Sequence, residues 1–157
     1  MDIQAAKLAL LLAIAAENPS LLSSETPYER MVGNVGYTIF EGRGEVEIRV
    51  EKIEHNAANT GTMKVVLWAC TECMRDNSGW KGHRIAELRL DGISRGYAYS
   101  NIKRTVPMLS RPPNGRYIAL MTLESQQAGV FKTEDTRRFD KPMELGTNAP
   151  RIVFLVR

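Results

Sequence analysis

Residues 44–53, GEVEIRVEKI, alternate apolar and charged side chains over most of their length. Val46, Ile48 and Val50 occupy one set of alternate positions, and glutamate or arginine occupies the other. Successive side chains of a β-strand point to opposite faces of a sheet, so this period of two predicts a strand with one buried and one wet face. Such a strand needs an apolar layer to pack against.

Further short strands follow at close intervals. The polar turn HNAANTGT, residues 55–62, leads into MKVVLWA, residues 63–69, and the two strands are expected to form a hairpin. Residues 74–83, MRDNSGWKGH, are expected to form a loop. Glycine, proline and Asn-Gly turns separate the remaining predicted strands, which are RIAELRL, GYAYSNI, KRTVPML, GRYIALMTLE and RIVFLV. The sequence therefore predicts an all-β fold, an antiparallel β-sandwich of about seven to eight strands with one N-terminal helix.

Length and composition fit one domain with this core. The chain has 157 residues, of which 43% are apolar and 25% are charged, as in soluble globular proteins. We expect an N-terminal helix or export segment over residues 1–18 and an irregular connection over residues 19–44, with one helical turn near Tyr28–Val32. The β-sandwich domain is expected over residues 45–157.

The first residues allow two interpretations. The apolar stretch from Leu8 to Ala16, with the small residues Ala13 and Ala15, is typical of an export signal. The same residues favour a helix, which Pro19 would end. The stretch is too short for a transmembrane span, which takes about 20 apolar residues.

Charge is unevenly distributed along the chain. Residues 1–99 hold 11 Lys and Arg against 13 Asp and Glu, whereas residues 100–157 hold 10 against 5. A basic second part indicates either a face for an anionic partner or ordinary solvation of the surface.

The order of several strand and turn motifs resembles a β-sandwich module found near the C-termini of secreted or surface bacterial proteins. The similar motifs lie within residues 45–140, and they are Gly61-Thr62, Leu67-Trp68-Ala69, Gly96-Tyr97, Thr105-Val106-Pro107 and Pro112-Pro113 with Gly115 and Tyr117. The resemblance implies a β-sandwich and an accessory role beside exported enzymes or adhesins. It implies no catalytic residues, and it favours a secreted or cell-envelope location over a cytoplasmic one.

Cys70 and Cys73 follow a predicted core strand, Val65 to Ala69, in which Trp68 is expected to be a packing residue. A thioredoxin-type centre is disfavoured because a loop, and no helix, is expected after the pair. Two interpretations stay open for the cysteines: a small disulfide in an oxidising compartment, or free thiols in a reducing one. The alternative is a zinc site, in which His83 and His55 complete the ligand set. We predict no cofactor, with zinc as the one alternative.

Tyr97 and Tyr99 lie two apart, hence on one face of a predicted strand, and Lys103 and Arg104 follow them. Aromatic rings with nearby cations suit the bases of single-stranded nucleic acid or sugar rings. The alternative is that both tyrosines face the core.

No motif for nucleophilic catalysis, nucleotide binding or metal-dependent hydrolysis is present in the sequence. We therefore predict a non-catalytic binding or interaction module of a bacterial envelope or secreted system, with a protein or glycan surface as its partner. The zinc- or thiol-dependent protein and the single-stranded nucleic-acid binder are the alternatives.

Overall fold

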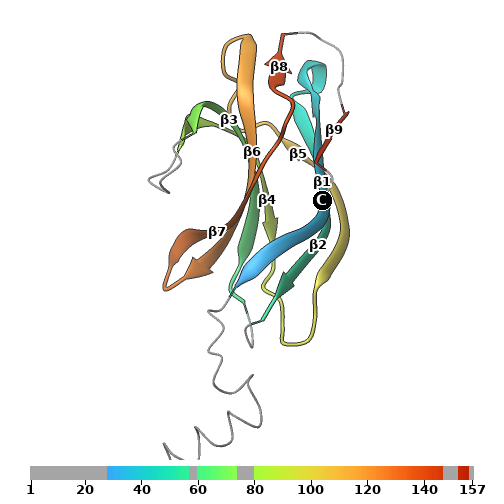
Figure 1. Cartoon of the computed structure of the whole chain (residues 1–157), viewed down its shortest axis with the longest axis vertical. Helices are drawn as coiled ribbons and strands as arrows, with labels where there is room; N and C mark the ends of the chain where they lie inside the picture. Colours follow the sequence, from blue (N-terminus) through green and yellow to red (C-terminus); the bar gives the residue numbers. More distant parts are fainter. Residues whose placement is uncertain (1–27, 57–59, 74–79, 147–151, 156–157) are drawn as a thin grey trace, which may run out of the picture.

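Antiparallel strands make up nearly all of the regular structure in the computed structural model, which describes residues 28–56, 60–73, 80–146 and 152–155. Within these ranges the chain forms nine strands and one short 3-10 helix, η1, so the all-β prediction is confirmed (Figure 1). The elements in chain order are β1 (Glu29–Phe40), η1 (Glu41–Arg43), β2 (Glu45–His55), β3 (Met63–Cys73), β4 (Trp80–Leu90), β5 (Tyr99–Pro107), β6 (Gly115–Gln127), β7 (Val130–Arg138), β8 (Met143–Leu145) and β9 (Ile152–Leu155).

The strands form two curled sheets that share one core. The first sheet has the order β5-β2-β1-β9, and the second has the order β4-β3-β6-β7 with β8 paired to β6. Val46, Ile48 and Val50 of β2 are buried, as their period of two predicts. They meet buried side chains of β3 and β6 in the same apolar cluster. Tyr37 of β1 crosses the core to Phe139, with the two ring centroids 4.9 Å apart.

The expected irregular connection over residues 19–44 is wrong where the structure describes it, because β1 occupies Glu29–Phe40. The expected helical turn near Tyr28–Val32 is wrong for the same reason. A β-bulge between Val32 and Val35 interrupts the alternation of inward and outward side chains, so the sequence of β1 shows no continuous period of two. Gly33 adopts φ +79° within the bulge, a conformation that favours glycine.

Two strands that we expected to form a hairpin, β2 and β3, lie in different sheets. The loop expected over residues 74–83 ends earlier, because β4 begins at Trp80. The two strands expected at residues 96–102 and 103–109 are one strand, β5. The predicted N-terminal helix over residues 1–18 lies outside the described residues.

Besides β1, two strands were not predicted from the sequence. β7 has the sequence VFKTEDTRR, in which charged and polar residues occupy both faces, so it shows no apolar alternation. β8 has three residues, too few for any periodic pattern. The count of strands in the described chain therefore exceeds the seven or eight expected.

The two sheets are joined along a seam where β1 extends beyond β9. Alternate residues of a strand turn their N–H and C=O groups away from a given neighbour, and Met31 turns both away from β2. The Met31 N–H donates to Asp135 Oδ2 at 2.8 Å, and the Arg137 guanidinium donates to the Met31 carbonyl oxygen. Two side chains of β7 therefore bind the backbone groups that a further strand would pair.

Replacement of Asp135 by alanine is expected to destabilise the fold by about 2–4 kcal/mol. The substitution leaves the Met31 N–H without its acceptor and removes the nearby carboxylate from the buried Arg137, whose Nε lies 3.7 Å from Asp135 Oδ2. Urea unfolding followed by circular dichroism measures the change. Asp140→Ala, at an exposed position, is the control and should stay within about 0.5 kcal/mol of the native chain. Equal stabilities of the two variants would show that the seam contributes nothing.

Candidate functional site

A cleft opens on the outer face of the second sheet, where β3 ends and β6 begins. Pairing of Cys70 with Ile118 and of Leu120 with Arg138 puts these four residues on the face that points away from the shared core. The chain beyond β7 then passes Asp140 and Pro142 on its way to β8 and closes one side of the cleft. Three strands and one connection therefore build its walls.

The cleft has a volume of about 660 Å³, within the range of small-ligand sites. Ile118 and Cys70 provide apolar surface, and Thr71 adds a hydroxyl. Arg116 and Arg138 line it as well, and both are exposed. The Arg116 Nε lies 3.3 Å from Glu144 Oε1. The side chain of Arg138 has no hydrogen bond or ion pair to any described residue, so its guanidinium is available to a ligand.

Cys70 is almost fully buried beneath the cleft. Its strand neighbour is Gly82, where an added Cβ would lie 3.0 Å from Cys70 Sγ and 2.5 Å from the Ala69 carbonyl oxygen. Glycine at position 82 therefore allows β4 to approach β3 closely at this point.

The structure separates the four residues proposed as zinc ligands. Cys70 and Cys73 lie at the same end of β3. His83 pairs with Ala69 and shares the inner face of the sheet, opposite to Cys70, and its ring packs against Tyr117 at 6.2 Å. His55 ends β2, where its Nε2 donates to the Ser94 carbonyl oxygen at 3.1 Å.

His55 lies near the start of β3, at the other end of that strand from Cys70 and Cys73. Glu29, the strand partner of His55, is hydrogen-bonded to Ser125, which pairs with Met63 at the start of β3. Cys70 stands seven residues beyond Met63 along β3, a distance of about 23 Å. Among the described residues no three His, Cys, Asp or Glu side chains form a group able to hold a metal ion. The zinc site stays a prediction that this arrangement does not support.

The proposed tyrosine and cation face is also divided. Tyr97 precedes β5 and is 73% exposed, whereas Tyr99 is half-buried, packs against the core and donates its hydroxyl to the Asp91 carbonyl oxygen. Lys103 pairs with Arg49 on the outer face, and Arg104 pairs with the buried Ile48 on the inner face. The two cations therefore point to opposite faces of the sheet.

A polar network beside the cleft was not predicted. We expected Trp68 in the core, but it lies on the outer face, where its indole N–H donates to Thr122 Oγ1 at 2.9 Å. Glu124 is buried on this face and accepts two hydrogen bonds of 3.0 Å from Arg84. The Arg84 guanidinium also lies 4.8 Å from the centroid of the Trp68 ring. The hydrogen bonds from Arg84 explain how the Glu124 carboxylate can be buried although it lies on the outer face.

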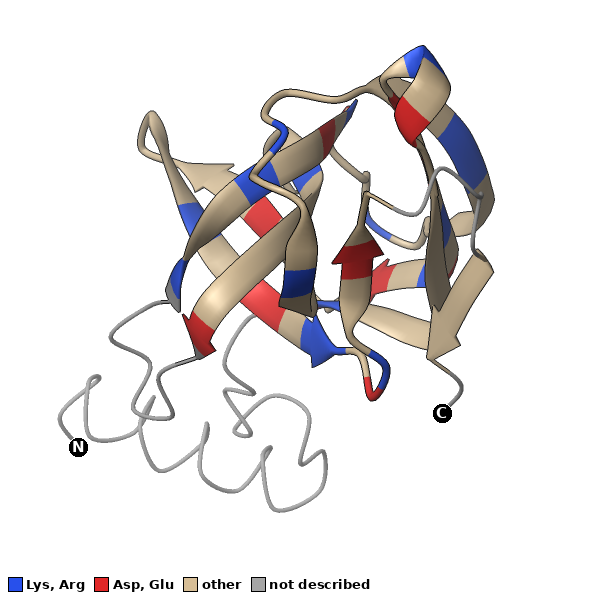
Figure 2. Cartoon of the chain, turned by 90° about the horizontal axis from the view of Figure 1, so that it is seen from above, with Lys and Arg blue, Asp and Glu red and all other residues tan. Residues whose placement is uncertain are grey.

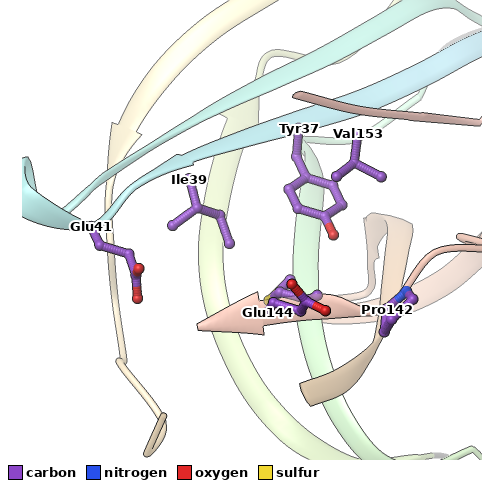
Figure 3. Close-up of a pocket in the computed structure, with 7 residues that line it drawn as sticks. Tyr37, Ile39, Glu41, Pro142, Glu144 and Val153 are labelled. Carbon is purple, nitrogen blue, oxygen red and sulfur yellow. The ribbon is translucent and has the colours of Figure 1, made fainter. Parts of the chain in front are cut away.

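A small cavity lies between the sheets, and Figure 3 shows Tyr37 pointing into it from β1. Glu41 and Glu144 lie at its edge. Burial raises the pKa of Tyr37, so its hydroxyl stays protonated. The volume of about 20 Å³ suits roughly one water molecule, which excludes this cavity as a site for an organic ligand.

A second cluster of titratable groups lies at the far end of the core. Glu29 is 93% buried, given an exposed fraction of 7%, and its Oε2 has no hydrogen-bond partner among the described residues. Burial raises the pKa of the Glu29 carboxyl, a hydrogen bond with Ser125 opposes that shift, and the nearby Glu134 adds to it. His55 lies beside this pair.

No known protein family, curated protein or solved structure matches the chain. No helix of the described chain is long and apolar enough to cross a membrane. Lys and Arg are interspersed with Asp and Glu over the strands (Figure 2).

Replacement of Glu29 by glutamine is expected to stabilise the fold at pH 7. The folded-state pKa of Glu29 lies above its ordinary value of 4.5, so the folded state holds the proton more tightly and loses stability as pH rises from 4.5 through the raised pKa. Glutamine removes that loss, and the gain should shrink toward pH 4. Thermal unfolding between pH 4 and pH 8 measures it.

Glu54→Gln is the matched control for that prediction, since an ion pair with Arg30 lowers the pKa of Glu54. Its contribution is present above pH 4.5 and is lost as pH falls through the lowered pKa. The two variants should therefore shift stability at pH 7 in opposite directions. A shift of the same sign in both would refute the assignment of Glu29.

Replacement of Arg104 by valine is expected to promote self-association. β5 is an edge strand, and an inward-pointing charge on an edge strand opposes pairing with a second chain. Light scattering on a sizing column measures the change in mass relative to the native chain. Arg104→Lys, which keeps the charge, should elute as the native chain does.

Proposed function

We propose that the chain is a non-catalytic binding module that uses the cleft of the second sheet to hold an anionic group on its partner. The observation that carries this proposal is the unpaired guanidinium of Arg138 facing a cleft that Arg116 also lines. Guanidinium groups match carboxylates and phosphates in shape and charge, and they bind them through two parallel hydrogen bonds.

The rest of the cleft supports recognition of an extended segment of a partner protein. Ile118 offers apolar surface between the arginines. The Thr71 hydroxyl donates to the Lys81 carbonyl oxygen at 3.3 Å and can accept a hydrogen bond from a ligand. A cleft of about 660 Å³ that opens to solvent admits a few residues of an acidic peptide without closing around them. Asp140 at the rim favours partners that carry a cation in that position and opposes a second anion there.

Such a module fits the β-sandwich and the accessory role that the resemblance implies. The setting in a bacterial envelope or secreted system belongs to the same proposal. It rests on the strand and turn motifs of residues 45–140 and on the uneven charge of the chain, whose residues 100–157 include both arginines of the cleft.

Replacement of Arg138 by glutamate is expected to weaken binding of an immobilised hexaglutamate peptide at least about tenfold, because a charge-assisted hydrogen bond is replaced by repulsion. Surface plasmon resonance at 50 mM salt measures the affinity. Lys132→Glu makes the same change of charge at an exposed position near the other end of β7, outside the cleft. Equal losses in the two variants would show that the peptide senses only net charge, and the proposal would then fail.

A further inference from the structure

A groove of about 420 Å³ crosses the outer face of the first sheet, on the side of the molecule that the cleft does not use. Strand pairing defines its central row. Phe154 of β9 pairs with Gly36 of β1, Gly36 pairs with Arg49 of β2, and Arg49 pairs with Lys103 of β5. Directly opposite residues share a face, so an aromatic ring, a glycine and two cations follow one another across the four strands.

The glycine in this row fixes the position of the ring. A Cβ at Gly36 would lie 2.7 Å from Phe154 Cδ1, so the Phe154 ring occupies the space above the glycine backbone. The Arg49 guanidinium lies 5.1 Å from the centroid of the same ring. Phe154 is nevertheless 53% exposed. One side of the ring is therefore supported by the sheet, and the rest of it faces solvent as a ready platform.

Side chains that donate hydrogen bonds and side chains that accept them surround the Phe154 ring. Glu51 Oε2 accepts the Asn34 N–H at 2.6 Å, and its other oxygen has no partner among the described residues. The side-chain amides of Asn34 and Asn101 line the groove and are exposed, each with donors and an acceptor. Lys103 adds three donors. Hydroxyl groups, which both donate and accept, are the ligands that such a mixed set satisfies best.

The charges of the groove cancel. Arg49 is paired with Glu47 on the same face, and Lys103 is balanced by Glu51. A nucleic acid strand would bring its phosphates close to both carboxylates, which disfavours it. A protein partner needs roughly 800 Å² of surface with an apolar centre, whereas Phe154 and Ile152 are the large exposed apolar side chains of this face.

From these observations we infer that the groove is a second binding site, specific for a neutral glycan, in which a sugar ring stacks on Phe154 and its hydroxyl groups bind Glu51, Asn101 and Lys103. The apolar face of a pyranose matches the electron-rich face of the phenyl ring. The site does not depend on the arginine cleft, which lies on the outer face of the other sheet.

Titration of the full chain with cellohexaose, mannohexaose and chitohexaose, by calorimetry or by NMR shifts, tests the inference. At least one of these probes should bind, and Phe154→Ala should weaken it at least about tenfold. Ile152→Ala is the matched control, because Ile152 lies on the same strand and the same face, is 60% exposed and does not line the groove. It should bind within about twofold of the native chain, as should Arg138→Glu.

Three results would overturn the inference. The first is that no probe binds the native chain at millimolar concentration, and the second is that Phe154→Ala binds as the native chain does. The third is that a ten-residue oligothymidylate binds in place of the sugars, with a steep dependence on salt and on Phe154, which would assign the platform to nucleic acid. Glycan binding should change little between 50 and 300 mM salt. Loss of peptide binding in the cleft leaves this site untouched, so the two proposals fail separately.

Discussion

The binding of Met31 by Asp135 and Arg137 holds the two sheets in one arrangement. On the side away from β2, β1 has β9 beside its second half but no strand beside its first half within the described chain. Unpaired backbone groups at this buried position would cost several kcal/mol together, and the two side chains of β7 satisfy them. Because Asp135 and Arg137 must point inward, the alternation of β7 turns Arg138 outward. The wall of the cleft is thus a consequence of the seam.

The sequence predicts those parts of the fold whose periodicity survives tertiary packing. β2 is predicted correctly because every second side chain enters the core. β3 is predicted over residues 63–69 from its β-branched and aromatic residues, but the strand continues to Cys73. β1 is not predicted, since its bulge at residues 32–35 changes which side chains point inward, and β7 is not, since its inner positions hold Asp135 and Arg137 in place of apolar residues. Whether a segment forms a strand depends largely on its own residues. Whether two successive strands pair as a hairpin or lie in different sheets depends on partners that are distant in the sequence.

The candidate sites follow the same division. Cys70 and Lys103 were singled out from sequence, and both line surface depressions, but with neighbours other than those expected. Arg138 and Phe154 carried no signal, because an isolated arginine or phenylalanine in a strand is ordinary. Their significance appears only when pairing puts Arg138 beside Leu120 and Phe154 beside Gly36. The outer faces of the two sheets therefore differ. The Trp68 network covers part of the second sheet, whereas Gly36 of the first sheet makes room for the exposed ring of Phe154.

The alternation of the chain between the sheets governs how it can assemble. After β1 and β2 the chain leaves the first sheet for β3 and β4, returns for β5, leaves again for β6 to β8 and returns for β9. Val35 near the start of the described chain pairs with Leu155 at its end. Such long-range pairings carry a large loop-closure entropy, so topology of this kind folds in milliseconds to seconds and not in microseconds. The platform on β9 and β1 is therefore complete only when both ends of the domain have met, which makes it a reporter of the fully folded state.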